Sequence, residues 1–173
     1  MTLRTIELGG VLVPIAASVE LVQTYELFGG RSVLRMMSGA AVIQQHWSKL
    51  RTTINGGGLI PAGLSGLDYS QPLLLKCAAP RGVCSASNVI ALPSSRRSDT
   101  GYEPTGYAQL ATGQQIKTPV AMGGDVATLT PVTGAIAYTC NYTPQMTVVC
   151  DGPRERFDVQ SARPAWDLTA EEA

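Results

Sequence analysis

Short apolar runs that alternate with turn residues are the feature that most constrains what this chain can fold into. After residue 70 these runs are LLLKC (73–77), NVIAL (88–92), YAQLA (107–111) and VATL (126–129). Turns that contain Gly or Pro separate them, such as PRG (80–82). Many short strands at this spacing are typical of sandwiches and barrels, and no convincing pattern of a long helix is present. The sequence therefore predicts an all-β fold, a β-sandwich or split β-barrel with long loops.

Residues 33–47 (VLRMMSGAAVIQQHW) fit two interpretations. With Ser38-Gly39 as a two-residue turn, the segment is a hairpin in which Leu34 faces Ile43. The apolar residues then share one face, and Arg35 lies on the other. A helix through the same apolar residues also fits the spacing. Because a glycine inside a helix costs about 1 kcal/mol and the flanking segments alternate like strands, we favour the hairpin.

Residues 49–54 (KLRTTI) alternate most clearly, with Leu50, Thr52 and Ile54 on the face opposite Lys49, Arg51 and Thr53. The segment NGGGLIPAGLSG (55–66) follows. It lacks the Lys of a phosphate-binding loop, the third glycine of a dinucleotide-binding fingerprint and the serine position of a nucleophile elbow. We therefore interpret it as a flexible connection with an apolar patch.

The last part of the chain contains two further predicted elements. Residues 135–150 (AIAYTCNYTPQMTVVC) predict a hairpin about Pro144-Gln145. From Pro153 onwards the residues are charged, with Phe157 and Trp166 isolated among them. We expect residues 153–173 to be an extended C-terminal arm, either disordered or docking its aromatic residues on a neighbour. Residues 1–152 form the β-rich domain, as one sandwich or as two lobes, 1–76 and 77–152.

Residues that carry enzyme chemistry are sparse. His46 is the only histidine, it lies beside Trp47 in a strand-like segment, and nothing marks a nucleophile near it. The aspartates lie near turns, where they form local backbone hydrogen bonds, and no pair of carboxylates stands out. The sequence thus predicts a protein that is not an enzyme, with His46 as a surface or interface residue.

Four cysteines leave three interpretations open: Cys77, Cys84, Cys140 and Cys150. Their spacing does not match the knuckles of zinc ribbons, but an iron–sulfur cluster tolerates looser spacing if the loops meet. In the predicted hairpin Cys140 and Cys150 fall nearly opposite each other, within reach of a disulfide that would form after release into an oxidising medium. Buried free thiols are the third interpretation. Beyond a zinc ion or cluster, we expect no cofactor.

The charge composition points to protein partners. The formal net charge is zero, only 15% of the residues are charged, and arginines outnumber lysines by ten to three. Arg is enriched and Lys depleted at protein–protein interfaces, although a GC-rich genome also favours Arg. Without a basic block we expect no nucleic acid as main partner. Without an apolar stretch of 18 residues or a secretory signal we expect no membrane span and synthesis in the cytoplasm.

Residues 1–76 resemble structural tail proteins of long-tailed bacteriophages, in particular tail-tube and distal-tail (baseplate) ring proteins. The resemblance is carried by TIELGGVLVPI (5–15), RMMSGAAVIQQHW (35–47), NGGGLIPAGLSGLD (55–68) and LDYSQPLLLKCAAPR (67–81). It implies a sandwich or split barrel whose sheet joins neighbours into a ring around a channel.

The same resemblance implies that the protein lies in the virion, with copies of itself and other tail proteins as partners. The expected interface residues are Arg35, His46, Trp47, Gly57, Ile60, Phe157 and Trp166. An iron–sulfur cluster occurs in some tail-tip proteins, but the cysteine spacing here does not match theirs. Two alternatives are a metal- or cluster-binding β module that uses the four cysteines, and a receptor-binding β domain with Tyr102, Tyr107 and Trp166 as candidates.

Overall fold

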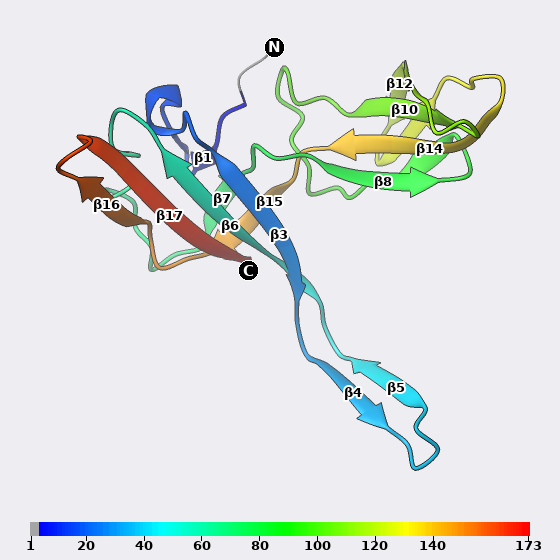
Figure 1. The fold of residues 1–173 in the computed structure, drawn as a ribbon, viewed down its shortest axis with the longest axis horizontal. Helices are drawn as coiled ribbons and strands as arrows, with labels where there is room; N and C mark the ends of the chain where they lie inside the picture. Colours follow the sequence, from blue (N-terminus) through cyan, green and yellow to red (C-terminus); the bar gives the residue numbers. More distant parts are fainter. Residues whose placement is uncertain (1–3) are drawn as a thin grey trace. The chain divides into compact units, whose positions relative to one another are not determined.

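The computed structural model describes residues 4–173, and these divide into two compact units. Unit 1 contains the chain up to Glu7 and Leu75–Met146, and unit 2 contains Leu8–Leu74 and Thr147–Ala173. Both units are built from strands, and the only helical element in the described chain is a short 3-10 turn, η1 (Ile15–Ala17). The all-β prediction is therefore confirmed (Figure 1).

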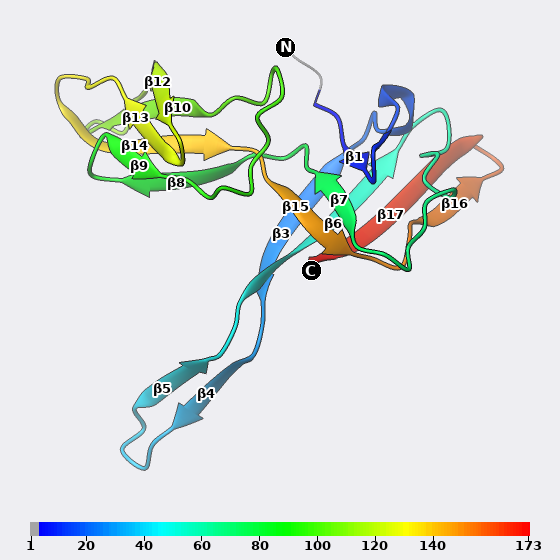
Figure 2. The ribbon, with the colours of Figure 1, turned by 180° about the vertical axis from the view of Figure 1, so that it is seen from behind.

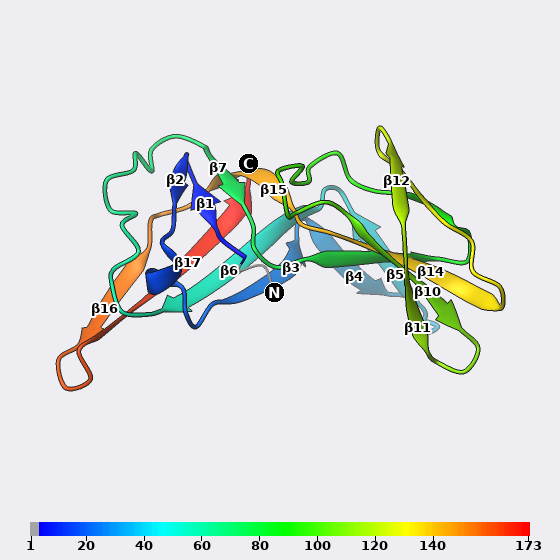
Figure 3. The same ribbon diagram turned by 90° about the horizontal axis from the view of Figure 1, so that it is seen from above.

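The sheet of unit 2 has the order β2-β1-β7-β15-β17-β6-β3, and β16 pairs with β17 beside this path. The bounds of its strands are β1 (Glu7–Leu8), β2 (Val11–Leu12), β3 (Val22–Phe28), β6 (Lys49–Gly57), β7 (Leu73–Lys76), β15 (Gln145–Val149), β16 (Arg154–Asp158) and β17 (Arg163–Glu172). Strands β1, β7 and β15 span the points where the chain passes from one unit to the other. Figure 3 shows β17 in red beside β6 in cyan and β3 in blue.

Alternation of buried and exposed residues explains why β6 occupies the interior of this sheet. Leu50, Thr52 and Ile54 are buried, as their period of two predicts, and β3 and β17 pair with β6 on its two sides. On β17 the buried residues are Pro164, Trp166, Leu168 and Ala170. The two strands thus bury one apolar face along their common length.

The predicted C-terminal arm is wrong for most of its length. Residues 154–158 and 163–172 form strands β16 and β17, and β17 lies inside the sheet between β15 and β6. Trp166 belongs to the core of this sheet, with 2% of its surface exposed, and does not lie on an extended arm. The charged residues that led to the prediction of a C-terminal arm are interspersed with buried apolar residues. Burial of these apolar residues orders strand β17.

A hairpin does form over residues 33–47, but with a different register from the predicted one. Its strands are β4 (Arg31–Arg35) and β5 (Ala41–Gln45), and Leu34 pairs with Val42 rather than with Ile43. The connecting loop spans residues 36–40 and has Gly39 at a positive φ of 81°. This difference of one residue in register changes which side chains share a face. The apolar residues therefore lie on both faces of the hairpin and not on one.

Unit 1 is a small β-sandwich. One sheet has the order β11-β10-β14-β8 and the other has the order β12-β13-β9. Their bounds are β8 (Arg81–Ser85), β9 (Val89–Ala91), β10 (Thr105–Leu110), β11 (Gln115–Thr118), β12 (Val120–Gly123), β13 (Val126–Leu129) and β14 (Ala135–Tyr142). Both sheets contribute to one buried cluster that includes Ile90, Leu129, Tyr138 and Cys140.

The predicted hairpin about Pro144-Gln145 is also wrong. Strand β14 pairs with β10 and β8 in unit 1, whereas β15 lies between β7 and β17 in the sheet of unit 2. The chain passes between the units after Met146. The predicted boundary between lobes 1–76 and 77–152 is close to Leu75, where the chain enters unit 1. Residues 147–173, however, belong to unit 2 again.

Candidate assembly surface

The β4–β5 hairpin, which we call the arm, continues from the paired strands β3 and β6 (Figure 1). Its apolar residues are directly opposite each other on both faces: Val33 with Ile43 on one face, and Leu34 with Val42 on the other. Val33, Leu34 and Ile43 each expose more than half of their surface. An isolated two-stranded hairpin is only marginally stable in water, and both faces of the arm expose apolar side chains.

The tip of the arm is the most exposed apolar point of the described chain. Met36 is 58% exposed, and Met37 is fully exposed. Beside them the Arg35 guanidinium donates to the carbonyl of Gly39 at 3.2 Å. Residues 29–49 contain Arg31, Arg35 and Lys49 but no Asp or Glu. The arm therefore presents apolar side chains within a purely cationic segment.

The base of the arm is built around Trp47. Its ring meets Phe28 edge to face, with ring centroids 5.5 Å apart. Gly29 and Gly30 lie so close to Trp47 that a Cβ on either one would meet its backbone or its ring. The NH of His46 also donates to the carbonyl of Gly30 at 3.0 Å. These contacts hold the two arm strands together where they leave the sheet.

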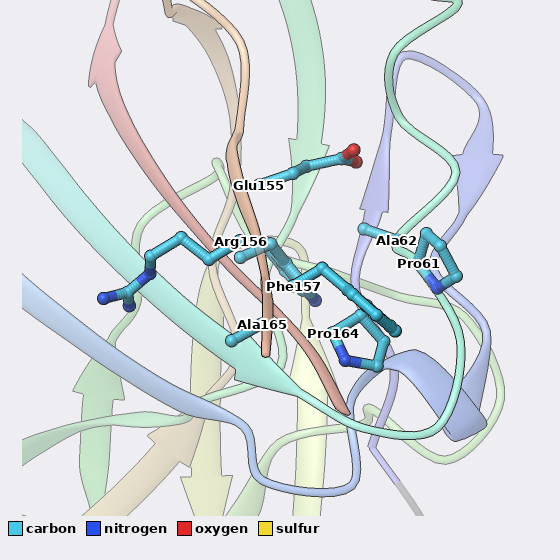
Figure 4. A pocket seen from close by; sticks show the side chains of 8 residues that line it. Pro61, Ala62, Glu155, Arg156, Phe157, Pro164 and Ala165 are labelled. Atoms are coloured by element: carbon cyan, nitrogen blue, oxygen red, sulfur yellow. The ribbon is translucent and has the colours of Figure 1, made fainter. Parts of the chain in front are cut away.

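A hollow of about 130 Å³ lies at the opposite end of β6 and β17 (Figure 4). Its lining comes from the loop after β6 and from the β16–β17 hairpin: Pro61, Ala62, Glu155, Arg156, Phe157, Pro164, Ala165 and Trp166. In the ladder Glu155 pairs with Trp166 and Phe157 with Pro164, which places these four residues on one face. Arg156 points away from this face in Figure 4. We call this the Phe157 hollow.

The three consecutive glycines help to form this end of the sheet. A Cβ on Gly56 would overlap the indole ring of Trp166, and a Cβ on Gly58 would overlap the carbonyl of Ala16. The indole Nε1 of Trp166 also donates to the carbonyl of Ala17 at 2.9 Å. Gly56 and Gly57 are strand residues, so the interpretation of this segment as a flexible connection is wrong for its first residues.

The seven predicted interface residues lie on the arm or at its base, in the loop after β6, at the two hollows, or in the core of unit 2. Arg35 and His46 are exposed on the arm, and Trp47 is half exposed at its base. Ile60 is 42% exposed in the loop after β6, and Phe157 is 63% exposed at the hollow. Gly57 lines a second hollow, beside Glu20 and Arg163, whose side chains lie 3.8 Å apart. Only Trp166 is buried, and the sequence pattern did not distinguish it from the exposed Phe157.

The four cysteines are divided between the units, with Cys77, Cys84 and Cys140 in unit 1 and Cys150 in unit 2. Cys77, Cys140 and Cys150 are buried, and Cys84 is exposed. Cys84 pairs with Thr139 rather than with Cys140, so Cys84 and Cys140 point to opposite faces of their sheet. Among residues 4–173 no group of three or more His, Cys, Asp or Glu side chains is placed to hold a metal ion. Burial raises the pKa of the Cys140 and Cys150 thiols.

The aromatic residues proposed for receptor binding do not form a shared surface. Tyr102 is 7% exposed, and its hydroxyl lies within hydrogen-bonding distance of the backbone of Thr5. Tyr107 is half-buried on β10, and Trp166 belongs to the core of unit 2. Two of the three residues are thus buried within their own units.

Arg97 forms a polar cluster in unit 1 that the sequence did not reveal. Its guanidinium binds the Asp99 carboxylate, donates to the carbonyls of Thr5 and Cys77 at 2.8 Å, and stacks on the ring of Tyr102. The hydrogen bond from Arg97 lowers the pKa of Asp99. A buried cation that is saturated by backbone carbonyls and one carboxylate acts as a structural tie between segments of unit 1.

Comparison with models of known protein families finds no match, and no curated protein matches the chain. In the described residues, no helix has the length and apolar character needed to cross a membrane.

Proposed function

We propose that this chain is a structural subunit of a bacteriophage tail, part of the tail tip or baseplate or associated with the tube. It acts by assembling with copies of itself and with other tail proteins. One observation carries the assembly part of the proposal: the arm exposes apolar side chains on both faces of a two-stranded hairpin. Burial of these side chains in a complex stabilises both the arm and the complex.

Two further observations support assembly. Strand β3 lies at the edge of its sheet and runs directly into the arm, and an edge strand can pair with a strand of a neighbouring subunit. The low charge and the excess of Arg over Lys suit a surface that is largely covered by partners. The phage setting is supported by the resemblance of residues 1–76 to tail proteins.

The mass of the purified protein, measured by light scattering with negative-stain images of the peak, tests this proposal. We expect discrete rings or closed oligomers. Ile43→Ser should shift the protein to smaller species, because Ile43 lies at the centre of one apolar face of the arm.

Ile136→Ser provides the matched control, since Ile136 and Ile43 are both 57% exposed but Ile136 lies in unit 1. The control should assemble as the unsubstituted protein does. A monomer at all concentrations, or equal effects of the two substitutions, would contradict assembly through the arm.

A further inference from the structure

We infer that the arm tip of one copy docks in the Phe157 hollow of a second copy, so that subunits associate head to tail. This inference rests on the proposed assembly function and names the surface that receives the arm. It is argued from three observations within unit 2: the position of the two surfaces, their apolar character and their charges.

The arm and the β16–β17 hairpin, which contributes to the lining of the hollow, lie at opposite ends of the same strand ladder (Figure 2). Phe28 pairs with Lys49 next to the arm, whereas Gly57 pairs with Ala165 next to the hollow. The nine residues of β6 between these ends span about 30 Å. The arm continues beyond Lys49, so its tip is farther still from the hollow of its own chain.

Because the tip cannot reach its own hollow, a contact between them joins two different surfaces of two copies. Such a heterologous contact leaves one free arm and one free hollow on each pair. Further copies therefore add in the same way until the chain of subunits closes into a ring or grows as a filament.

The tip and the hollow are complementary in apolar character. The hollow is lined by the rings of Phe157, Pro164 and Pro61 and by the methyl group of Ala62. The tip presents Met37, whose long unbranched side chain adapts to irregular apolar surfaces. A hollow of about 130 Å³ is of the size that one such side chain occupies.

Their charges are complementary as well. Glu155 lies on the same face of the hairpin as Phe157 and takes part in no ion pair within the described residues. Arg35 lies next to the methionines of the tip, in a segment without acidic residues. The second hollow is less suitable, because its Glu20 already faces Arg163.

Engineered disulfides test this contact directly. In a Cys84→Ser background, we would combine Met37→Cys with Phe157→Cys and oxidise the folded protein at concentrations where it assembles. Each copy then carries one cysteine at the tip and one at the hollow. We expect a ladder of covalent dimers, trimers and larger species on a non-reducing gel, whereas each single variant should give no species beyond a dimer.

Charge reversal tests the polar part of the contact. Arg35→Glu should weaken association by at least about tenfold, because it places two carboxylates together. Glu155→Arg should weaken it similarly, and the double variant should recover most of the loss. Arg154→Glu is the matched control, since Arg154 lies on the opposite face of β16 from Glu155 and does not line the hollow, and it should change association less than about twofold.

The outcomes separate this inference from the proposed function. Closed oligomers without a disulfide ladder would overturn the docking in the Phe157 hollow and leave assembly through the arm standing. Monomers in every variant would overturn both. Binding of the protein to anionic lipid vesicles that Arg35→Glu abolishes, without a ladder, would assign the arm to a membrane surface and likewise overturn the docking.

Discussion

Replacing Gly56 by alanine should destabilise unit 2 strongly, although the change adds a single methyl group. The Cβ of an alanine at this position would overlap the indole ring of Trp166. That ring is 2% exposed and donates a hydrogen bond to the carbonyl of Ala17, so moving the ring disturbs buried packing and this hydrogen bond. The backbone of Gly56 is ordinary strand, which excludes φ strain as the cause.

The expected loss follows from two terms. Overpacking of a filled core costs about 1–3 kcal/mol. Displacement of Trp166 also weakens its hydrogen bond to Ala17, which contributes about 0.5–1.5 kcal/mol. The sum is a decrease of about 1.5–4.5 kcal/mol in the free energy of unfolding. Gly66→Ala is the matched control, because a Cβ there meets nothing within 4 Å, and its effect should stay within about 0.5 kcal/mol.

Urea unfolding followed by circular dichroism measures this loss in variants with and without the Trp166 side chain. A double-mutant cycle with Trp166→Leu then isolates the clash, since the smaller side chain leaves room for the methyl group. We expect the double variant to be more stable than the sum of the single effects by at least about 1 kcal/mol. Additive effects, or a Gly56→Ala variant as stable as the control, would refute the reasoning.

Three further predictions concern the thiols, the polar cluster of unit 1 and the arm. One thiol, Cys84, should react rapidly with a thiol reagent in the folded protein, and all four should react in denaturant; more than one rapid thiol would contradict the burial of the others. Asp99 has a lowered pKa because of its hydrogen bond from Arg97, so its contribution to stability is present above pH 3.8 and is lost as the pH falls through the folded value. In acid titrations the Asp99→Asn variant should therefore be less stable than the unsubstituted protein at neutral pH, and its free energy of unfolding should fall less below pH 3.8. The same dependence of the free energy of unfolding on pH in both proteins would contradict this prediction. Replacing residues 31–45 by a short Gly-Ser link should change the free energy of unfolding of unit 2 by less than about 0.5 kcal/mol, because the arm is exposed along its length, and a large loss in thermal or urea melts would show that the arm belongs to the core.

The fold was predictable where apolar and polar residues alternate regularly along a strand. Leu50, Thr52 and Ile54 are buried on β6 as expected, because this strand has polar residues on one face and buries the other. On β17 the same alternation of Trp166, Leu168 and Ala170 is present, but Asp167 and the acidic residues that follow it concealed the pattern. The partner strand of β17 lies more than 100 residues earlier, and no local signal reveals such a pairing.

The candidate surface was only partly predictable, because turn length and packing decide it. The existence of the arm could be predicted from Gly39 and its neighbours, but its register depends on a loop of five residues rather than two. Gly56 suggested flexibility, whereas in the structure it provides room for an aromatic ring. Likewise Pro144-Gln145 looked like a hairpin turn, although the strands β14 and β15 have other partners. In each case a contact distant in sequence overrides the local preference.

The place of β17 in the sheet also has a consequence for synthesis on the ribosome. Strand β6 is complete at Gly57, but its partner Ala165 is translated more than 100 residues later. At about 5–20 residues per second, one edge of β6 waits for roughly 5–20 s after it has been made. During this interval the ring of Trp166 is missing and the Phe157 hollow does not yet exist. A nascent chain can thus display its arm but has no hollow to receive one, which delays head-to-tail association between neighbouring chains on a polysome until each subunit has been translated through β17.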